Sequence, residues 1–465
     1  MHDSNSYSLP WVVLLVAACA HAPARTPEHG DEAPAPHLRE AASRGGQGEH
    51  HPEHTDPAPD PAQVTNVSLG GILAFADRSS PVLAVARSTR SRVEVARAAA
   101  RGVLADNPEL TLAAGPRFAG GGTGSELEVS ISQRLRLSEG GARRDAAERL
   151  RELTDAEIEE VRWLVHCEVH AEFHRVLVEQ ERARIALGVR EFQSEVLGIV
   201  QRQIAAGEAA PLTLRLAEAE EAQAAQQLVG AEQALLSARI RLGQLSGWPV
   251  HTPPMASGNL DEPEDPPDEQ RLLAVARERL PSLRTGSARV REAAARVEVA
   301  ERAAGLQPSL GVQYRREDDP GPEGTVDVLM GVVSLPIPSF DRNQSERAQA
   351  RSDRTVAQAE LAAAGQLLAG RIAEARSEVL AAARRTRTYG KEILPRFQEN
   401  LVMLRRAFEL GELDILALST GRERFLRIQS DALDAALDYF VALAALERVV
   451  GVDLWRDDHH EEDGE

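Results

Sequence analysis

The sequence predicts a mainly α-helical protein with a small β part, built from long helical hairpins in a tandem repeat. Two Gly-Glu stretches, 205–214 and 409–418, each lie between long segments that are poor in helix breakers. Their offset of 204 residues recurs at Gly247 and Gly451, which end the two descending helices. Aromatic residues make up only 4% of the chain, which is typical of long helices rather than of one large globular core.

Composition excludes several classes of protein. The net charge of −19 argues against nucleic acid as a partner. No run of 18 or more apolar residues lies in the repeated body, so no transmembrane helix is expected there. The chain has two cysteines, Cys19 and Cys167. If Cys19 is modified, Cys167 has no partner cysteine, so no disulfide framework is possible.

Residues 1–18 are interpreted as a signal peptide, because the short apolar run 11–18 is followed by small residues. Val16-Ala17-Ala18-Cys19 resembles a bacterial lipobox, in which the cysteine is lipidated and becomes the new N-terminus. The alternative is an ordinary small-residue cleavage site that happens to contain a cysteine. Residues 1–10 contain no Lys or Arg, which is unusual for either kind of signal.

Residues 19–66 are expected to form a disordered, lipid-anchored tether, since they are rich in Pro, His and acids and have few large apolar residues. Residues 456–465 form an acidic, histidine-containing tail. Such tracts bind divalent metals loosely, but a solvated polar segment is the simpler interpretation.

Each half of the body contains a predicted pair of strands. Residues 109–118 are predicted to form a strand. Residues 126–132 alternate in polarity, and Leu127, Val129 and Ile131 face one way. In the second half, 310–314 and 326–333 alternate likewise, with Val326, Val328, Met330 and Val332 taken as one set. Strands of about ten residues are long enough to cross a membrane when tilted. An ordinary soluble sheet with one wet face is the alternative.

The remaining sequence is helical. A short helix is expected from Ser68 to Asp77, and another from about residue 80 to 104. A helix of about 65 residues runs from Gly140 to Gly207, and its counterpart in the second half is predicted to kink at Pro395. The predicted boundaries are 67–267 for the first repeat (strands 109–137, hairpin 142–246) and 268–455 for the second (strands 308–338, hairpin 343–450).

The repeat, the Pro-x-Leu openings of the strands at 108–110 and 308–310, and the Gly-Glu-x-x-x-Leu tips together resemble the TolC family of bacterial outer-membrane channels over residues 67–451. The resemblance implies a homotrimer. Its chains would share a twelve-stranded β-barrel in outer-membrane lipid, with four strands from each, above an α-barrel tunnel. It also implies a periplasmic adaptor and an inner-membrane pump of the RND type as partners.

The candidate functional residues follow from this resemblance and from spacing. The tips that would dock the adaptor contain Gly207, Glu208, Leu212, Gly411, Glu412 and Leu416, and Cys19 would carry the lipid. His166, His170 and His174 recur every fourth residue on one helix, a spacing that can hold a metal. The simpler interpretation is the polar face of a packed helix. No catalytic triad or phosphate loop is present, so neither an enzyme nor a cofactor is expected.

The resulting hypothesis is the outer-membrane channel of a tripartite efflux system, which passively conducts cargo. The histidine- and acid-rich ends favour heavy-metal cations as that cargo. Drug efflux and type I secretion are alternatives within the class. A non-transporting periplasmic coiled-coil scaffold is the alternative from another class, although a scaffold has no need of two strand pairs at equivalent places.

Overall fold

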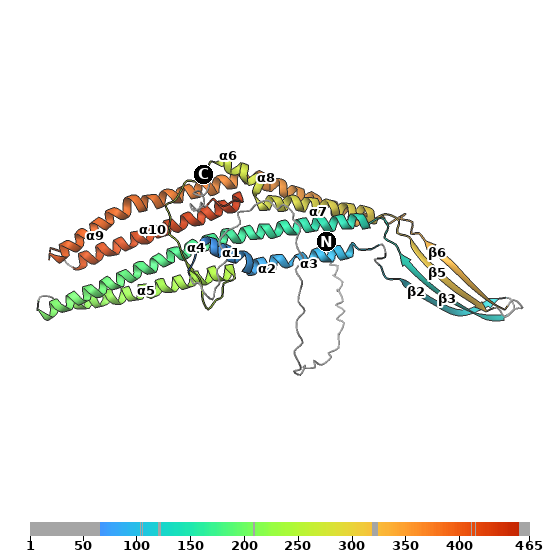
Figure 1. Ribbon diagram of the computed structural model, residues 1–465, viewed down its shortest axis with the longest axis horizontal. Helices are drawn as coiled ribbons and strands as arrows, with labels where there is room; N and C mark the ends of the chain where they lie inside the picture. The colour runs from blue at the N-terminus through green and yellow to red at the C-terminus, as the bar shows by residue number, and fades with distance from the viewer. Residues whose placement is uncertain are drawn as a thin grey trace, which may run out of the picture. The chain divides into compact units, whose positions relative to one another are not determined.

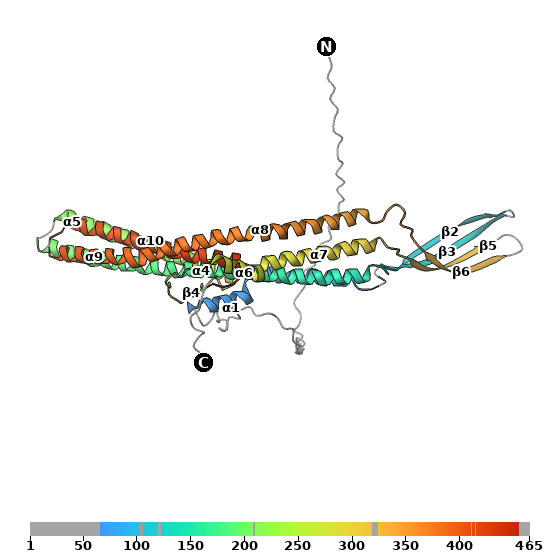
Figure 2. The same cartoon turned by 90° about the horizontal axis from the view of Figure 1, so that it is seen from above.

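The computed structural model describes residues 66–454, apart from 103, 105, 120, 121, 208, 209, 319–323, 411 and 414. Cys19, the tether and the acidic tail therefore lie outside the described residues, as do Glu208 and Gly411 of the tips. Within the described part, long helices lie side by side, their hairpin turns at one end and the strands at the other (Figures 1 and 2). The predicted fold class, mainly helical with a small β part and an internal repeat, is confirmed.

The first half has three short helices, two long strands and one helical hairpin, besides two strands of two residues each. Pro81 occupies the first turn of the second helix, where its missing N–H costs nothing. The sequence predicts a single helix over 80–104, but the structure divides this segment at Thr89 and ends it at Ala99. The elements are α1 (Leu69–Ser79), α2 (Pro81–Ser88), α3 (Arg90–Ala99), β2 (Glu109–Ala119), β3 (Gly122–Arg134), α4 (Gly140–Ala205) and α5 (Pro211–Ser246).

The second half repeats this order. Pro281 again occupies the first turn of a helix. The Asp268 side chain caps the helix Glu269–Arg279 by accepting a hydrogen bond from the Arg271 N–H. The elements are α6 (Glu269–Arg279), α7 (Pro281–Ala303), β5 (Ser309–Asp318), β6 (Thr325–Ser334), α8 (Gln344–Thr388), η1 (Tyr389–Ile393), α9 (Leu394–Glu409) and α10 (Ile415–Val450). The π-helical turn η1 lies directly before Pro395, where the sequence predicts a kink.

Gly247 and Gly451 end α5 and α10 in the left-handed conformation, each with φ of 82°. A Cβ on Gly247 would lie 2.1 Å from the carbonyl oxygen of Ser79, and one on Gly451 would lie 2.6 Å from Cα of Leu280. Each glycine is thus needed both for its backbone conformation and for close packing against the end of a short helix. The same joint is built twice, once in each half.

The four long strands form one sheet in the order β2-β3-β5-β6, and every neighbouring pair is antiparallel. The two hairpins therefore lie edge to edge, joined by the β3–β5 pair. Within the described residues, β2 and β6 each have one edge that pairs with no other strand.

A second, two-stranded sheet is absent from the sequence-based prediction. β1 (Asn66–Val67) pairs in parallel with β4 (Met255–Ala256) in the connection after α5. Asn66, predicted as the last residue of the tether, therefore belongs to a strand. Two residues are too few to show an alternating pattern, so only the tertiary pairing reveals this sheet.

Two similar apolar cores stabilise the helical part. One packs α1, α2, α4 and α5 around residues such as Ile72, Leu83 and Trp248, and the other packs α6, α8 and α10 around Ile372 and Phe440. Among the described residues, the stretch 69–99 is long and apolar enough to span a membrane by length and composition alone. It is divided into α1, α2 and α3, and several of its large apolar side chains lie in the first core.

Candidate functional site

One face of the sheet is apolar. The register places Leu112 beside Val129, Ile131 beside Val312, and Tyr314 beside Leu329. Many of these side chains are exposed, including Leu112 at 65% and Leu329 at 73%. An exposed apolar face of this extent marks a surface that contacts something other than water.

The register decides which side of β6 continues the apolar face. The sequence predicts that Val326, Val328, Met330 and Val332 form one set, and the pairing places them on one side of the strand. The apolar face is continued by the other set, through Leu329 and Val333, because these pair with Tyr314 and Leu310. Val328 instead pairs with Arg315, so β6 carries apolar side chains on both faces.

The opposite face of the sheet is charged. The Arg315 guanidinium lies 3.4 Å from Glu126, 3.2 Å from Glu128 and 3.8 Å from Glu317. Three carboxylates thus surround one guanidinium, which leaves this group with a net negative charge. Since side chains alternate along a strand, the neighbouring Arg316 belongs to the apolar face, with Tyr314.

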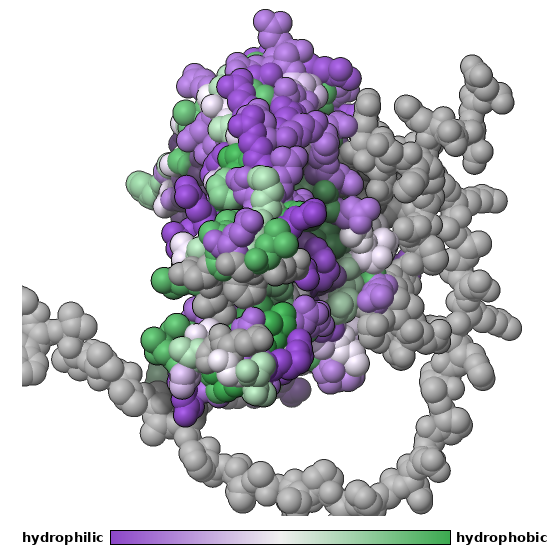
Figure 3. All heavy atoms as spheres, turned by 90° about the vertical axis from the view of Figure 1, so that its left-hand side faces the viewer, coloured by the Kyte–Doolittle hydropathy of each residue, from purple (hydrophilic) through white to green (hydrophobic). Residues whose placement is uncertain are grey.

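The helical hairpins turn at the opposite end from the strands. Gly207 adopts a φ of 76° after α4, with open space around it. Leu212 and Leu416, at the starts of α5 and α10, are 69% and 65% exposed. Glu412 is exposed in the second turn. The view onto this end shows hydrophobic residues among hydrophilic ones (Figure 3).

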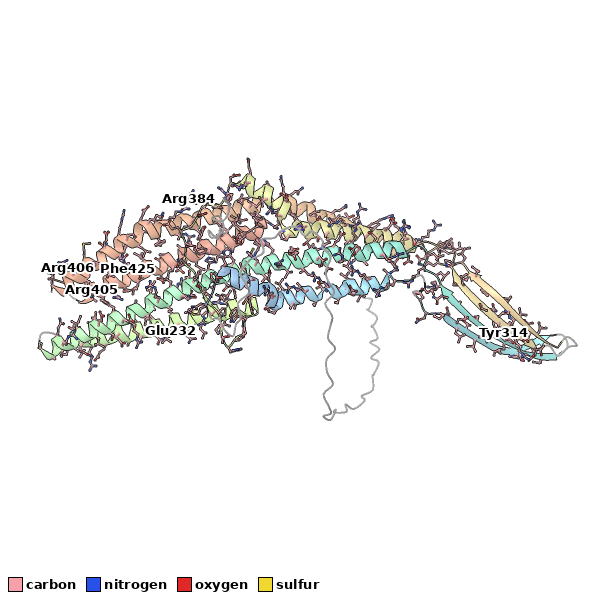
Figure 4. The ribbon with its side chains drawn as sticks, viewed as in Figure 1. Glu232, Tyr314, Arg384, Arg405, Arg406 and Phe425 are labelled. Carbon is pink, nitrogen blue, oxygen red and sulfur yellow. The ribbon has the colours of Figure 1, made fainter. Side chains whose placement is uncertain are left out.

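Near these tips, an arginine on one hairpin contacts the other. The Arg422 guanidinium on α10 lies 3.7 Å from the ring centroid of Phe192 on α4. Burial, followed by the charge of Arg405, lowers the pKa of Arg422 to about 10. Arg405 and Arg406 lie on α9 beside this region, whereas Tyr314 lies at the other end of the described part (Figure 4).

The structure brings two of the three candidate histidines together with carboxylates that the sequence analysis missed. Nδ1 of His170 lies 2.7 Å from Oε2 of Glu447 on α10, and both side chains are buried. Nε2 of His166 lies 3.5 Å from Oδ2 of Asp453. One ligand atom from each of His170, Glu447 and Asp453 lies within 4.8 Å of the others. We call His166, His170, Glu447 and Asp453 the His/acid cluster.

His174 has a different environment. Its ring stacks on Phe440 with centroids 3.9 Å apart, and its Nδ1 donates a hydrogen bond to the carbonyl oxygen of His170 at 2.9 Å. Burial lowers the pKa of His174 to about 3 and that of His170 to about 4. His174 thus supports His170 within the core rather than joining the His/acid cluster.

Cys167 is completely buried. Burial, and next the charge of Glu447, raises the pKa of its thiol, so the thiolate does not form at neutral pH. Glu447 and Asp453 lie more than 270 positions along the chain from the histidines, and only the packing of α10 on α4 reveals their role. A weak signal does exist, since Glu447 is a carboxylate within an otherwise apolar stretch of α10.

The apolar sheet face, the charged opposite face and the exposed hairpin turns are the features that a resemblance to outer-membrane channels implies. The family model described as "Outer membrane efflux protein" matches residues 272–452. The chain is similar to these proteins, and the resemblance to the TolC family that the sequence indicates is confirmed.

Individual relatives agree with this class. The cobalt-zinc-cadmium resistance protein CzcC of Cupriavidus metallidurans is 28% identical over 349 residues, which cover 74% of this chain and 81% of CzcC. The Campylobacter jejuni CmeC outer-membrane channel has a TM-score of 0.64 at 14% identity, covering 84% of this chain and 87% of CmeC. The open state of the Neisseria gonorrhoeae MtrE outer-membrane channel has a TM-score of 0.63 at 18% identity, covering 84% and 90%. The two structural likenesses concern the fold alone.

Proposed function

We propose that this protein is the outer-membrane channel of a tripartite efflux system and that it conducts cargo passively, without catalysis. The observation that carries the proposal is the sheet, which has one exposed apolar face, one charged face and open edges. Its strands have ten to thirteen residues, enough to cross a membrane when tilted.

The open edges support a trimer. Strand edges exposed to lipid leave backbone groups without hydrogen-bond partners, so membrane strands occur in closed barrels. Four strands do not close a barrel, whereas three copies of this chain supply twelve strands by pairing β2 of one copy with β6 of the next. The apolar face then contacts outer-membrane lipid, and Glu126, Glu128, Arg315 and Glu317 line the water-filled interior.

Heavy-metal cations are the cargo that we propose. The similarity to CzcC over most of both chains supports this choice, because that relative is named for cobalt, zinc and cadmium resistance. The excess of carboxylates around Arg315 supports it independently, since acidic rings favour the passage of cations. Drug efflux or type I secretion remains the alternative within the class.

The hairpin tips are proposed as the docking site for a periplasmic adaptor, which links the channel to an inner-membrane pump of the RND type. Leu212 and Leu416 support this role, because each presents a large apolar side chain at an exposed helix start. Gly207, Glu208, Gly411 and Glu412 complete the two turns. Cys19 is proposed as the site of a lipid anchor at the outer membrane.

Single-channel conductance in planar bilayers tests the proposal. Purified protein is expected to insert as stable trimers that conduct, with a reversal potential that favours cations in a salt gradient. Folded protein that neither inserts nor conducts would instead support the periplasmic scaffold. A conducting channel that fails to restore zinc, cobalt or cadmium tolerance to cells lacking their own channel, with the cognate adaptor and pump present, would support another cargo.

A further inference from the structure

We propose that His166, His170, Glu447 and Asp453 bind one divalent transition-metal ion of the zinc class, in a structural site that joins α4 to the end of α10. This site is separate from any path that cargo takes, because it lies within the packed helices of one chain. It does not depend on the proposed transport function.

The positions of the ligand atoms support a single ion. Zinc binds imidazole nitrogens and carboxylate oxygens at roughly 2.0–2.2 Å, so the ligand atoms of a tetrahedral site lie about 3.3–3.6 Å apart. Nε2 of His166 and Oδ2 of Asp453 are already 3.5 Å apart. The ligand atoms of His170, Glu447 and Asp453 lie within 4.8 Å of one another, and Asp453 joins His166 to this group.

The four residues come from segments that hold them rigidly. His166 and His170 lie one helical turn apart on α4, a spacing at which two imidazoles share one metal. Glu447 lies in the last turn of α10, and Asp453 follows the left-handed Gly451 that ends this helix. Two nitrogens and two carboxylate oxygens form a ligand set that suits zinc.

Charge also favours a cation. Glu447 is fully buried, and the side chain of Asp453 is only 24% exposed. A buried carboxylate is costly unless a positive charge or a hydrogen-bond donor lies beside it. A divalent ion held between Glu447 and Asp453 would neutralise both carboxylates.

Neighbouring groups hold the ligands as outer-shell partners do in metal sites. The N–H of Leu454 donates to Oε1 of Glu447 at 2.9 Å, leaving Oε2 directed at His170. The same Oε2 lies 2.7 Å from Nδ1 of His170, which fixes the orientation of that imidazole. Such partners orient ligands before a metal arrives.

The internal repeat shows that the fold does not require these four residues. The buried positions Val165, Val169 and Val176 of α4 match Leu368, Ile372 and Val379 of α8, an offset of 203. At that offset Ala369 and Ala373 replace His166 and His170. After the tips the offset is 204, and Gly243 and Pro249 replace Glu447 and Asp453. One half therefore has a buried His/acid cluster where the other half has none, although both halves have the same helical architecture.

The test is zinc binding by purified, EDTA-treated protein. Loose binding by the terminal segments is removed by using a full-length background in which every histidine outside residues 66–454 is replaced by serine. Titration calorimetry is expected to give one zinc per chain, together with a raised Tm. X-ray absorption at the zinc edge is expected to show four nitrogen or oxygen ligands at about 2.0–2.2 Å.

Two variants and one control decide the assignment. Glu447→Gln and His170→Gln keep the side chains polar and similar in size, and each is expected to weaken zinc binding more than about tenfold and to abolish the Tm increase. Glu168→Gln changes an exposed carboxylate on the same helix and is expected to bind like the background. Circular dichroism establishes that each variant is folded. The proposal is overturned if the background binds no zinc at this stoichiometry, which would leave a hydrogen-bonded network only, or if Glu447→Gln retains binding.

Discussion

His174 donates a hydrogen bond from Nδ1 to the carbonyl oxygen of His170, one turn earlier on the same helix. Both imidazoles are buried between α4 and α10 and are held in the neutral form, since burial lowers the pKa of His170 to about 4 and that of His174 to about 3. Packing of the first half against the second thus depends on histidines that must remain uncharged.

This arrangement predicts acid sensitivity. Without metal, the unfolded chain binds protons at these histidines below about pH 6.5, whereas the folded chain does not until about pH 4, so stability falls as the pH falls through this window. Over this window of about 2.5 pH units each histidine costs at most roughly 3 kcal/mol, since one pKa unit corresponds to about 1.4 kcal/mol. In EDTA, the midpoint of thermal unfolding by circular dichroism is expected to fall between pH 6.5 and 4. The fall is less steep than two histidines alone would cause, because burial raises the pKa of Glu447 and the folded chain takes up a proton there over the same range.

His174→Gln provides the comparison for that experiment. Glutamine keeps a donor for the His170 carbonyl oxygen but does not titrate, so the variant is expected to lose part of the fall in stability. Its stability at pH 8 reports the separate cost of losing the ring stacked on Phe440. An unchanged pH profile in His174→Gln would show that other groups cause the acid sensitivity.

Gly247 and Gly451 are expected to be less tolerant of alanine than Gly207. Gly247→Ala and Gly451→Ala place a Cβ within 2.1 Å and 2.6 Å of neighbouring backbone, so both are expected to destabilise the fold strongly. Gly207→Ala has a similar positive φ but open space, so only the left-handed conformation costs, about 1 kcal/mol. Urea unfolding of the three variants measures the difference. Equal losses at Gly207 and Gly247 would mean that the contact with Ser79 contributes nothing.

Much of the fold is predictable from sequence because its signals are local. Gly247, Gly451, Pro81 and Pro281 mark helix ends through their own backbone preferences, and the strands of each hairpin alternate in polarity. The sequence leaves open which side of β6 joins the apolar face, because both alternating sets of this strand contain apolar residues. Only the register with β5, set by tertiary pairing, decides which set joins Leu310 and Tyr314.

The His/acid cluster illustrates the limit for the candidate site. The four-residue spacing of His166, His170 and His174 is visible in the sequence, and it suggests three equivalent ligands. The structure gives them different partners, because the ring of His174 stacks on Phe440 while the ring of His170 is hydrogen-bonded to Glu447. Contacts between residues 277 positions apart depend on how α10 packs on α4, which no local pattern encodes.

The exposed leucines of the tips, Leu212 and Leu416, are expected to contribute to adaptor binding. Leu212→Asp and Leu416→Asp place a charge where an apolar contact with the adaptor is proposed, and each is expected to weaken adaptor binding at least about tenfold. Neither should lower the Tm, because both side chains are mostly exposed. Surface plasmon resonance with the purified adaptor measures the loss. Val250→Asp, at an exposed position away from the tips, is the matched control, and comparable weakening by this variant would remove the case for tip docking.

The charged face of the sheet predicts the ion selectivity of the channel. Glu128→Gln removes one of the carboxylates around Arg315, so the reversal potential in a salt gradient is expected to move towards that of anions. Arg315→Gln removes the guanidinium at the centre of the group and is expected to move the potential in the opposite direction. Arg316→Gln is the control, because this neighbouring side chain lies on the apolar face. If Arg316→Gln changes selectivity as strongly as Arg315→Gln, the two faces of the sheet have been assigned the wrong way round.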